Sequence, residues 1–117
     1  MDSFNPLHLS RNKLLSMGAK NYGYIYYKMN MYPYLAEFCG TLFVVYIILT
    51  TGNPIAIGAA LALSILLTTN ISGGHINPAV TVAMAAAGRI NNAETIPYIL
   101  SQVFGGLVAL QIFKRYS

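Results

Sequence analysis

The chain has 117 residues, of which 56% are hydrophobic and only 9% are charged. Both values are far from those of soluble domains and indicate an integral membrane protein. The net charge of +4 does not predict nucleic-acid binding, because no nucleic-acid recognition motif accompanies it. The single cysteine, Cys39, excludes a disulfide framework and a cysteine-rich metal site.

Residues 1–32 form a polar, basic and tyrosine-rich segment before the first apolar run. Part of it, LHLSRNKLLSMGAK, is compatible with a short helix on the membrane surface or with disorder. Its basic residues face anionic lipid in the simplest interpretation; they are Arg11, Lys13, Lys20 and Lys28. Tyrosines that approach the first span predict an anchor at the headgroup level; they are Tyr22, Tyr24, Tyr26, Tyr27, Tyr32 and Tyr34.

Residues 33–117 contain three apolar segments that predict membrane spans at 34–51, 54–71 and 96–113. Each has about 18 residues and would be about 27 Å long as a helix, close to the hydrocarbon core of about 30 Å. The short linker Gly52-Asn53 predicts a tight helical hairpin. Basic residues are more numerous on the amino-terminal side, so the positive-inside rule predicts a cytoplasmic amino terminus.

The segment 72–88 lies between two of these spans and predicts a re-entrant loop followed by a half-helix. Its helix-competent part, PAVTVAMAAAG, would reach only about 16 Å, which is too short to cross a bilayer. Non-helical backbone at membrane depth is tolerated only where it is buried in protein or lines a watery cavity. The stretch SGGHINPAVT (72–81) therefore predicts a cavity.

The residue types at the start of this half-helix indicate how the cavity would be lined. Gly73 and Gly74 allow a turn whose carbonyls point into the cavity. Asn77 is a good N-cap and Pro78 a good first helical residue. A helix that begins there directs its positive dipole end toward the middle of the membrane. Such a lining would pass neutral hydrogen-bonding molecules and repel cations.

The dipeptide Asn-Pro alone carries little functional information, because it recurs at Asn5-Pro6 and Asn53-Pro54. In those places it predicts only a turn or a helix start. The longer context GGHINPAV, placed between two spans, favours the pore interpretation.

That longer context resembles the signature of the major intrinsic protein family, the aquaporins and aquaglyceroporins. AEFCGT (36–41) and YILSQVFGG (98–106) are similar to motifs of that family's first and third spans. The resemblance covers about residues 33–113. It implies an all-α membrane protein with three transmembrane helices and one re-entrant half-helix, which is half of an aquaporin-like fold.

The resemblance also implies roles for individual residues. The pore signature would be Asn77, Pro78 and Ala79, and the pore carbonyls and loop would be Gly73, Gly74 and His75. Glu37 and Gln102 would support the loop from behind rather than contact solute. The family's constriction residue in the second span corresponds to Ile57, where aromatic residues are common, so the pore width and solute stay open.

The resemblance implies passive transport of water or small neutral solutes such as glycerol, but this sequence holds a single repeat. Polar loop backbone facing lipid would cost several kcal/mol per unsatisfied group, so a second half or a partner copy in inverted orientation is expected. The charge asymmetry disfavours an inverted homodimer. The alternative is a truncated, non-conducting member that acts as an interaction subunit or is a relic.

Two other classes are less well supported. An ion-coupled transporter would need more intramembrane ionisable residues than Glu37. An enzyme is not predicted, because the residues indicate no nucleophile–base pair and no metal cluster; no cofactor is implied.

Small residues recur at four-residue spacing in each span. This spacing either favours close helix packing or merely reflects the abundance of Ala and Gly in membrane helices. The pairs are Ala36/Gly40, Gly58/Ala62 and Gly105/Ala109.

Overall fold

The computed structural model describes residues 30–117. The predicted surface helix, the four basic residues of the polar segment and most of its tyrosines lie outside the described residues. Residues Met31–Ser117 form one compact unit.

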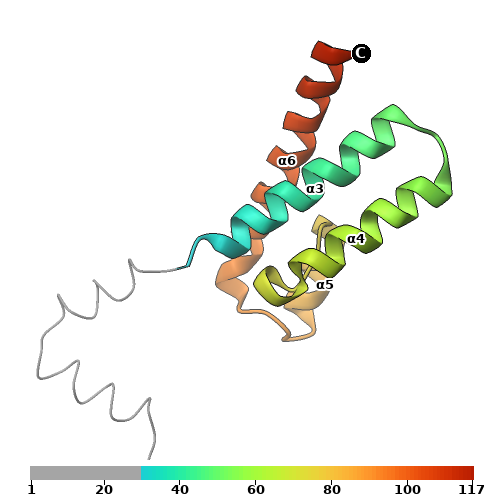
Figure 1. Cartoon of the computed structure of the whole chain (residues 1–117). Coiled ribbons are helices and arrows are strands. Elements are labelled where there is room, and N and C mark those ends of the chain that lie inside the picture. Colours follow the sequence, from blue (N-terminus) through green and yellow to red (C-terminus); the bar gives the residue numbers. More distant parts are fainter. Residues whose placement is uncertain (1–29) are drawn as a thin grey trace, which may run out of the picture. The chain divides into compact units, whose positions relative to one another are not determined.

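All regular secondary structure in the described residues is helical (Figure 1). The elements are α3 (Tyr32–Thr50), α4 (Pro54–Ser72), α5 (Pro78–Ala86), the short 3-10 helix η1 (Asn92–Glu94) and α6 (Thr95–Tyr116). By length and composition, α3, α4 and the segment Asn92–Tyr116 are able to cross a membrane. The predicted fold class is confirmed: three membrane-spanning helices accompany one half-helix, α5, which has nine residues and is about 13 Å long.

Asparagine and proline define where α4 and α5 begin. The Asn53 side chain accepts hydrogen bonds from the backbone N–H groups of Ile55 (2.8 Å) and Ala56 (3.3 Å). The Asn77 side chain accepts one from Ala79 N–H at 2.7 Å. In both helices proline follows the cap, where its fixed φ suits the first turn and its missing N–H costs nothing. These caps satisfy donors that apolar side chains around them cannot satisfy.

Helix α3 packs against both α4 and α6, whereas α5 packs against α6 (Figure 1). Gly105 allows the closest approach of α6 to α3, because a Cβ atom there would lie 2.4 Å from the carbonyl oxygen of Phe38. Gly40 likewise leaves room for a neighbour, whereas a Cβ atom on Gly58 would meet nothing within 4 Å. Small residues therefore serve close packing in α3 and α6 but not at Gly58.

The described residues are polar inside and apolar outside. The buried set has eight polar or charged residues and only five hydrophobic ones, while large apolar side chains such as Ile55 (78% exposed) and Leu66 (74%) cover the outside. In water this arrangement would leave large apolar surface exposed, but in a bilayer lipid covers that surface. The chain is therefore an integral membrane protein whose buried side chains are mostly polar.

The close contact at Gly105 yields a paired prediction. Gly105→Ala is expected to lower the free energy of unfolding by about 1–3 kcal/mol, because the added Cβ forces α6 away from the α3 backbone. Gly106→Ala is the control, since its Cβ would lie 3.6 Å from Val45 Cγ2, an ordinary contact distance. Thermal or denaturant unfolding in detergent measures both. Equal losses for the two variants would contradict the close-approach role of Gly105.

Candidate functional site

The loop between α4 and α5 holds its backbone in conformations that few residues adopt. Gly73 ends α4 with a φ of +94°, and Gly74 follows with +66°. A Cβ on Gly74 would also lie 3.3 Å from the carbonyl oxygen of Ile65. Glycine is favoured here because other residues disfavour positive φ and because α4 leaves little room for a side chain at Gly74. The loop thus turns back into the protein and presents its amide groups to α3.

The Glu37 carboxylate accepts hydrogen bonds from those amides. Glu37 is fully buried, and its Oε1 atom accepts from Ser72 Oγ at 2.6 Å and from the His75 N–H at 2.9 Å. Its Oε2 atom accepts from the Ile76 N–H at 2.6 Å and from Gln102 Nε2 at 2.8 Å. All four donors are neutral, and together they replace the solvation that the carboxylate would have in water.

A second set of hydrogen bonds joins the loop to α5 and α6 through Thr81, which is fully buried. Thr81 Oγ1 accepts from Gln102 Nε2 at 2.8 Å and lies 2.9 Å from His75 Nδ1. Both hydrogens of the Gln102 amide are thus engaged, one on Glu37 and one on Thr81. If the Thr81 hydroxyl donates its own hydrogen to His75, the imidazole carries its proton on Nε2.

Tyr98 on α6 supports the same loop from another side. Its hydroxyl donates to the Ser72 carbonyl at 2.7 Å, and its ring lies 5.1 Å from the His75 ring. The Tyr34 ring meets Tyr98 edge to face at 5.9 Å, and the Tyr34 hydroxyl donates to Glu94 Oε1 at 2.6 Å. These contacts connect the start of α3, the start of α6 and the loop.

Ile76 has a φ of +57°, which is unfavourable for a β-branched residue. Two contacts hold it in this conformation: its N–H donates to Glu37, and its side chain occupies the space above Gly40, where a Cβ would lie 2.6 Å from Ile76 Cδ1. Such a conformation costs of order 1–3 kcal/mol and persists only where the surrounding contacts hold it. Residues of this kind concentrate at functional sites.

The loop borders an open groove with a volume of about 790 Å³. Apolar side chains from all four α-helices form much of its wall, among them Val44, Ile65, Met84 and Val103. Most of the sequence-predicted site residues line it, namely Ile57, Gly73, Gly74, His75, Asn77, Pro78 and Gln102. Asn77 is exposed, and because its side-chain oxygen caps α5, its amide NH2 group is free to donate.

The predicted residues form two overlapping groups. Glu37, His75 and Gln102 belong to the buried hydrogen-bond cluster, and Ile57 and Asn77 line the groove. His75 and Gln102 also line the groove and thus belong to both groups. Sequence reasoning did not assign Ser72, Thr81 and Tyr98, although each is a polar group within or beside an apolar helix. Within residues 30–117, no group of three or more His, Cys, Asp or Glu residues could hold a metal ion.

A bundle of apolar helices around a loop, a half-helix and a groove defines a polytopic membrane protein with a re-entrant segment. Residues 26–117 match the Major intrinsic protein family, and the chain belongs to that family. It is similar to the glycerol uptake facilitator protein-like 6 of Lactiplantibacillus plantarum, with 41% identity over 74% of this chain and 44% of that protein.

Other relatives carry aquaporin names. The chain is 32% identical to aquaporin-8 of Rattus norvegicus over 92% of this chain and 45% of that protein. It is 46% identical to aquaporin Z of Photorhabdus laumondii over 52% of this chain and 26% of that protein. The chain therefore spans less than half the length of these curated relatives. No solved structure gives a significant match.

Replacing the buried carboxylate by an amide tests the hydrogen-bond cluster. In Glu37→Gln the new NH2 group must face either the His75 N–H or the Ile76 N–H, so at least one buried backbone donor loses its acceptor. The expected loss is about 1–3 kcal/mol for each such donor. Unfolding in detergent measures it.

Glu94→Gln is the matched control, because Glu94 accepts one hydrogen bond, from Tyr34, at a partly exposed position. Its effect is expected to stay below about 1 kcal/mol. Similar losses in the two variants would show that the Glu37 cluster does not hold the loop.

Proposed function

We propose that this chain forms one half of a passive channel for water or small neutral solutes such as glycerol. The observation that carries the proposal is the groove, which combines a largely apolar wall with the backbone of the loop and the start of α5. Family membership supports it, as do relatives named glycerol uptake facilitator and aquaporin. Nothing in such a passage requires catalysis, so we propose a channel and not an enzyme.

Donors and acceptors along the groove account for the proposed selectivity. Gly73, Gly74 and His75 line the groove as loop residues whose carbonyls are the proposed acceptors, and the free NH2 group of Asn77 is the proposed donor. The α5 dipole places partial positive charge at Asn77-Pro78, which disfavours cations. Water and polyols exchange hydrogen bonds with such groups without carrying charge.

Glu37 and Gln102 take a supporting part in this proposal. Glu37 is fully buried and is not among the residues that line the groove. All its hydrogen bonds go to Ser72, the loop and Gln102, so it positions the loop amides and does not touch solute. Ala79, next to Asn77 and Pro78, supplies the N–H that orients the Asn77 side chain.

A second half is part of the proposal, because the groove is open along one side. Polar backbone at membrane depth needs protein or water beside it, and the curated relatives are more than twice as long as the matched region. We propose that an inverted second half covers the groove, whether in one longer chain or as a separate partner, and that the amino terminus is cytoplasmic. One-sided labelling of a cysteine introduced at the amino terminus would test the orientation.

The experiment compares liposomes that contain this chain alone, this chain with a second half from a relative, and no protein. Osmotic swelling followed by light scattering measures water and glycerol flux. We expect low-activation-energy flux with the second half. Absence of flux in every combination, with the protein correctly inserted, would favour the alternative of a non-conducting interaction subunit.

Asn77→Asp separates the proposed donor role from simple helix capping. Aspartate caps a helix as well as asparagine does, so stability is expected to change by less than about 1 kcal/mol. Loss of the NH2 donor and gain of negative charge are expected to reduce neutral-solute flux at least about tenfold and to weaken cation exclusion.

Asn53→Asp is the control, because Asn53 also caps a helix ahead of a proline but does not line the groove. It should leave flux unchanged. Equal flux in the two variants would mean that Asn77 only starts the helix.

Ile57→Phe tests whether the groove wall at Ile57 limits solute size. A larger ring narrows the passage, so glycerol flux is expected to fall several-fold more than water flux. Ile55→Phe, on the same helix at a position 78% exposed and outside the groove, should change neither flux. An equal fall in water and glycerol flux in Ile57→Phe would contradict a size-selective role.

A further inference from the structure

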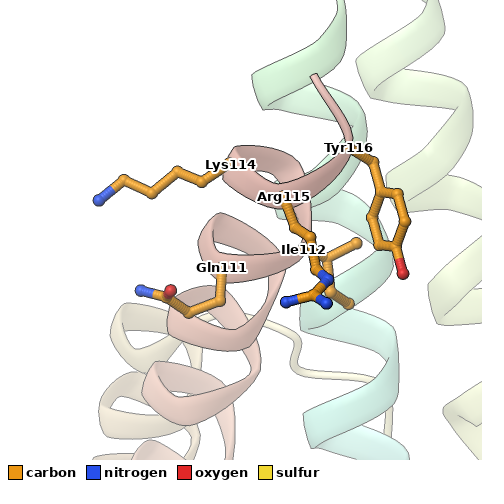
Figure 2. A pocket seen from close by; sticks show the side chains of 5 residues that line it. All are labelled: Gln111, Ile112, Lys114, Arg115 and Tyr116. Atoms are coloured by element: carbon orange, nitrogen blue, oxygen red, sulfur yellow. The ribbon is translucent and has the colours of Figure 1, made fainter.

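The last turn of α6 carries a second cavity, with a volume of about 460 Å³. Gln111, Ile112, Lys114, Arg115 and Tyr116 line it. Figure 2 shows Arg115 between Gln111 and Tyr116, with Lys114 extending to the other side of the helix. The cavity shares no residue with the groove.

The polar groups of this cavity are all hydrogen-bond donors. Lysine and arginine donate only, and the glutamine amide and the tyrosine hydroxyl donate as well. Lys114, Arg115 and Tyr116 are exposed, and so is Gln111. The planar guanidinium fork of Arg115 matches the oxygen atoms of a phosphate, and Lys114 adds a second positive charge at the same end of the helix.

No acidic side chain of residues 30–117 is available to neutralise this charge. The acidic side chains in that range are Glu37 and Glu94. Glu37 is enclosed by its hydrogen bonds inside the protein, and Glu94 accepts from Tyr34 just before α6 begins. With 22 residues, α6 is about 33 Å long, so Glu94 lies at the opposite membrane face.

The depth of the cavity in the membrane indicates the kind of ligand. The apolar run of α6 ends at Phe113, and the three residues that follow are two cations and a tyrosine, which is the residue order of a membrane–water interface. Ile112, which also lines the cavity, provides an apolar surface for the start of an acyl chain. We propose that this cavity binds the phosphate headgroup of an anionic phospholipid.

The test uses the purified full chain in detergent and counts retained lipid by native mass spectrometry. Phosphatidylglycerol is expected to be retained in preference to phosphatidylcholine, and millimolar inorganic phosphate is expected not to displace it. Equal retention of the two lipids, or displacement by inorganic phosphate, would overturn the proposal in favour of general lipid adhesion or of a free-anion site.

Arg115→Gln is expected to weaken phosphatidylglycerol binding about tenfold, because it removes a charge-assisted bidentate contact. Arg115→Lys should retain part of the affinity, since the charge stays but the fork is lost. Arg89→Gln removes the same charge from an exposed position between α5 and η1, before α6 begins, and should leave affinity unchanged. Equal weakening by Arg89→Gln and Arg115→Gln would overturn the proposal.

A stability measurement without lipid keeps the test interpretable. Arg115 is exposed, so its variants should unfold as the wild type does in lipid-free detergent, and should gain less stability when phosphatidylglycerol is added. The same added stability in wild type and Arg115→Gln would also overturn the proposal. This outcome is independent of solute flux, so a failure here leaves the proposed channel function untouched.

Discussion

A single buried carboxylate organises this protein. Glu37 lies in a helix that crosses the membrane, where an uncompensated charge is costly, and it accepts four hydrogen bonds from neutral donors. Those donors belong to the end of α4, to the loop and to α6. The Glu37 carboxylate is solvated by protein only if the end of α4, the loop and α6 all lie close to it. The need to solvate one charge therefore constrains how these segments are arranged.

The loop conformation follows from that constraint. The amides of His75 and Ile76 point at Glu37, which forces the chain through positive φ at Gly73, Gly74 and Ile76. Gly40 accommodates the Ile76 side chain and Gly105 allows α6 to come close enough for Gln102 to reach Glu37. Asn77 is then left at the groove with its oxygen committed to the helix start and its NH2 group free. Stability and the proposed solute path therefore depend on the same few contacts.

The helices have two surfaces with different needs, an apolar outer surface and the groove. Lipid covers the outer surface at no cost, because lipid tails and aliphatic side chains are equally apolar. The groove is different, since it exposes backbone groups that lipid cannot satisfy. The proposed second half would cover the groove, whereas the proposed lipid site at the end of α6 belongs to neither surface.

Local sequence features predict the helices and the half-helix, because span length, apolar composition and asparagine–proline caps do not depend on distant residues. They also place Asn77 at a helix start and mark Glu37 and Gln102 as polar residues in apolar surroundings. The roles proposed for these residues rest on resemblance to a family, not on composition or spacing. The contact between Glu37 and Gln102, 65 positions away, becomes visible only in the folded bundle, as does the completion of the cluster by Ser72, Thr81 and Tyr98. The positive φ of Ile76 above Gly40 likewise becomes visible only there. These contacts depend on how α3 and α6 are rotated and how closely they approach, and sequence periodicity does not specify those quantities in helices that are apolar all round.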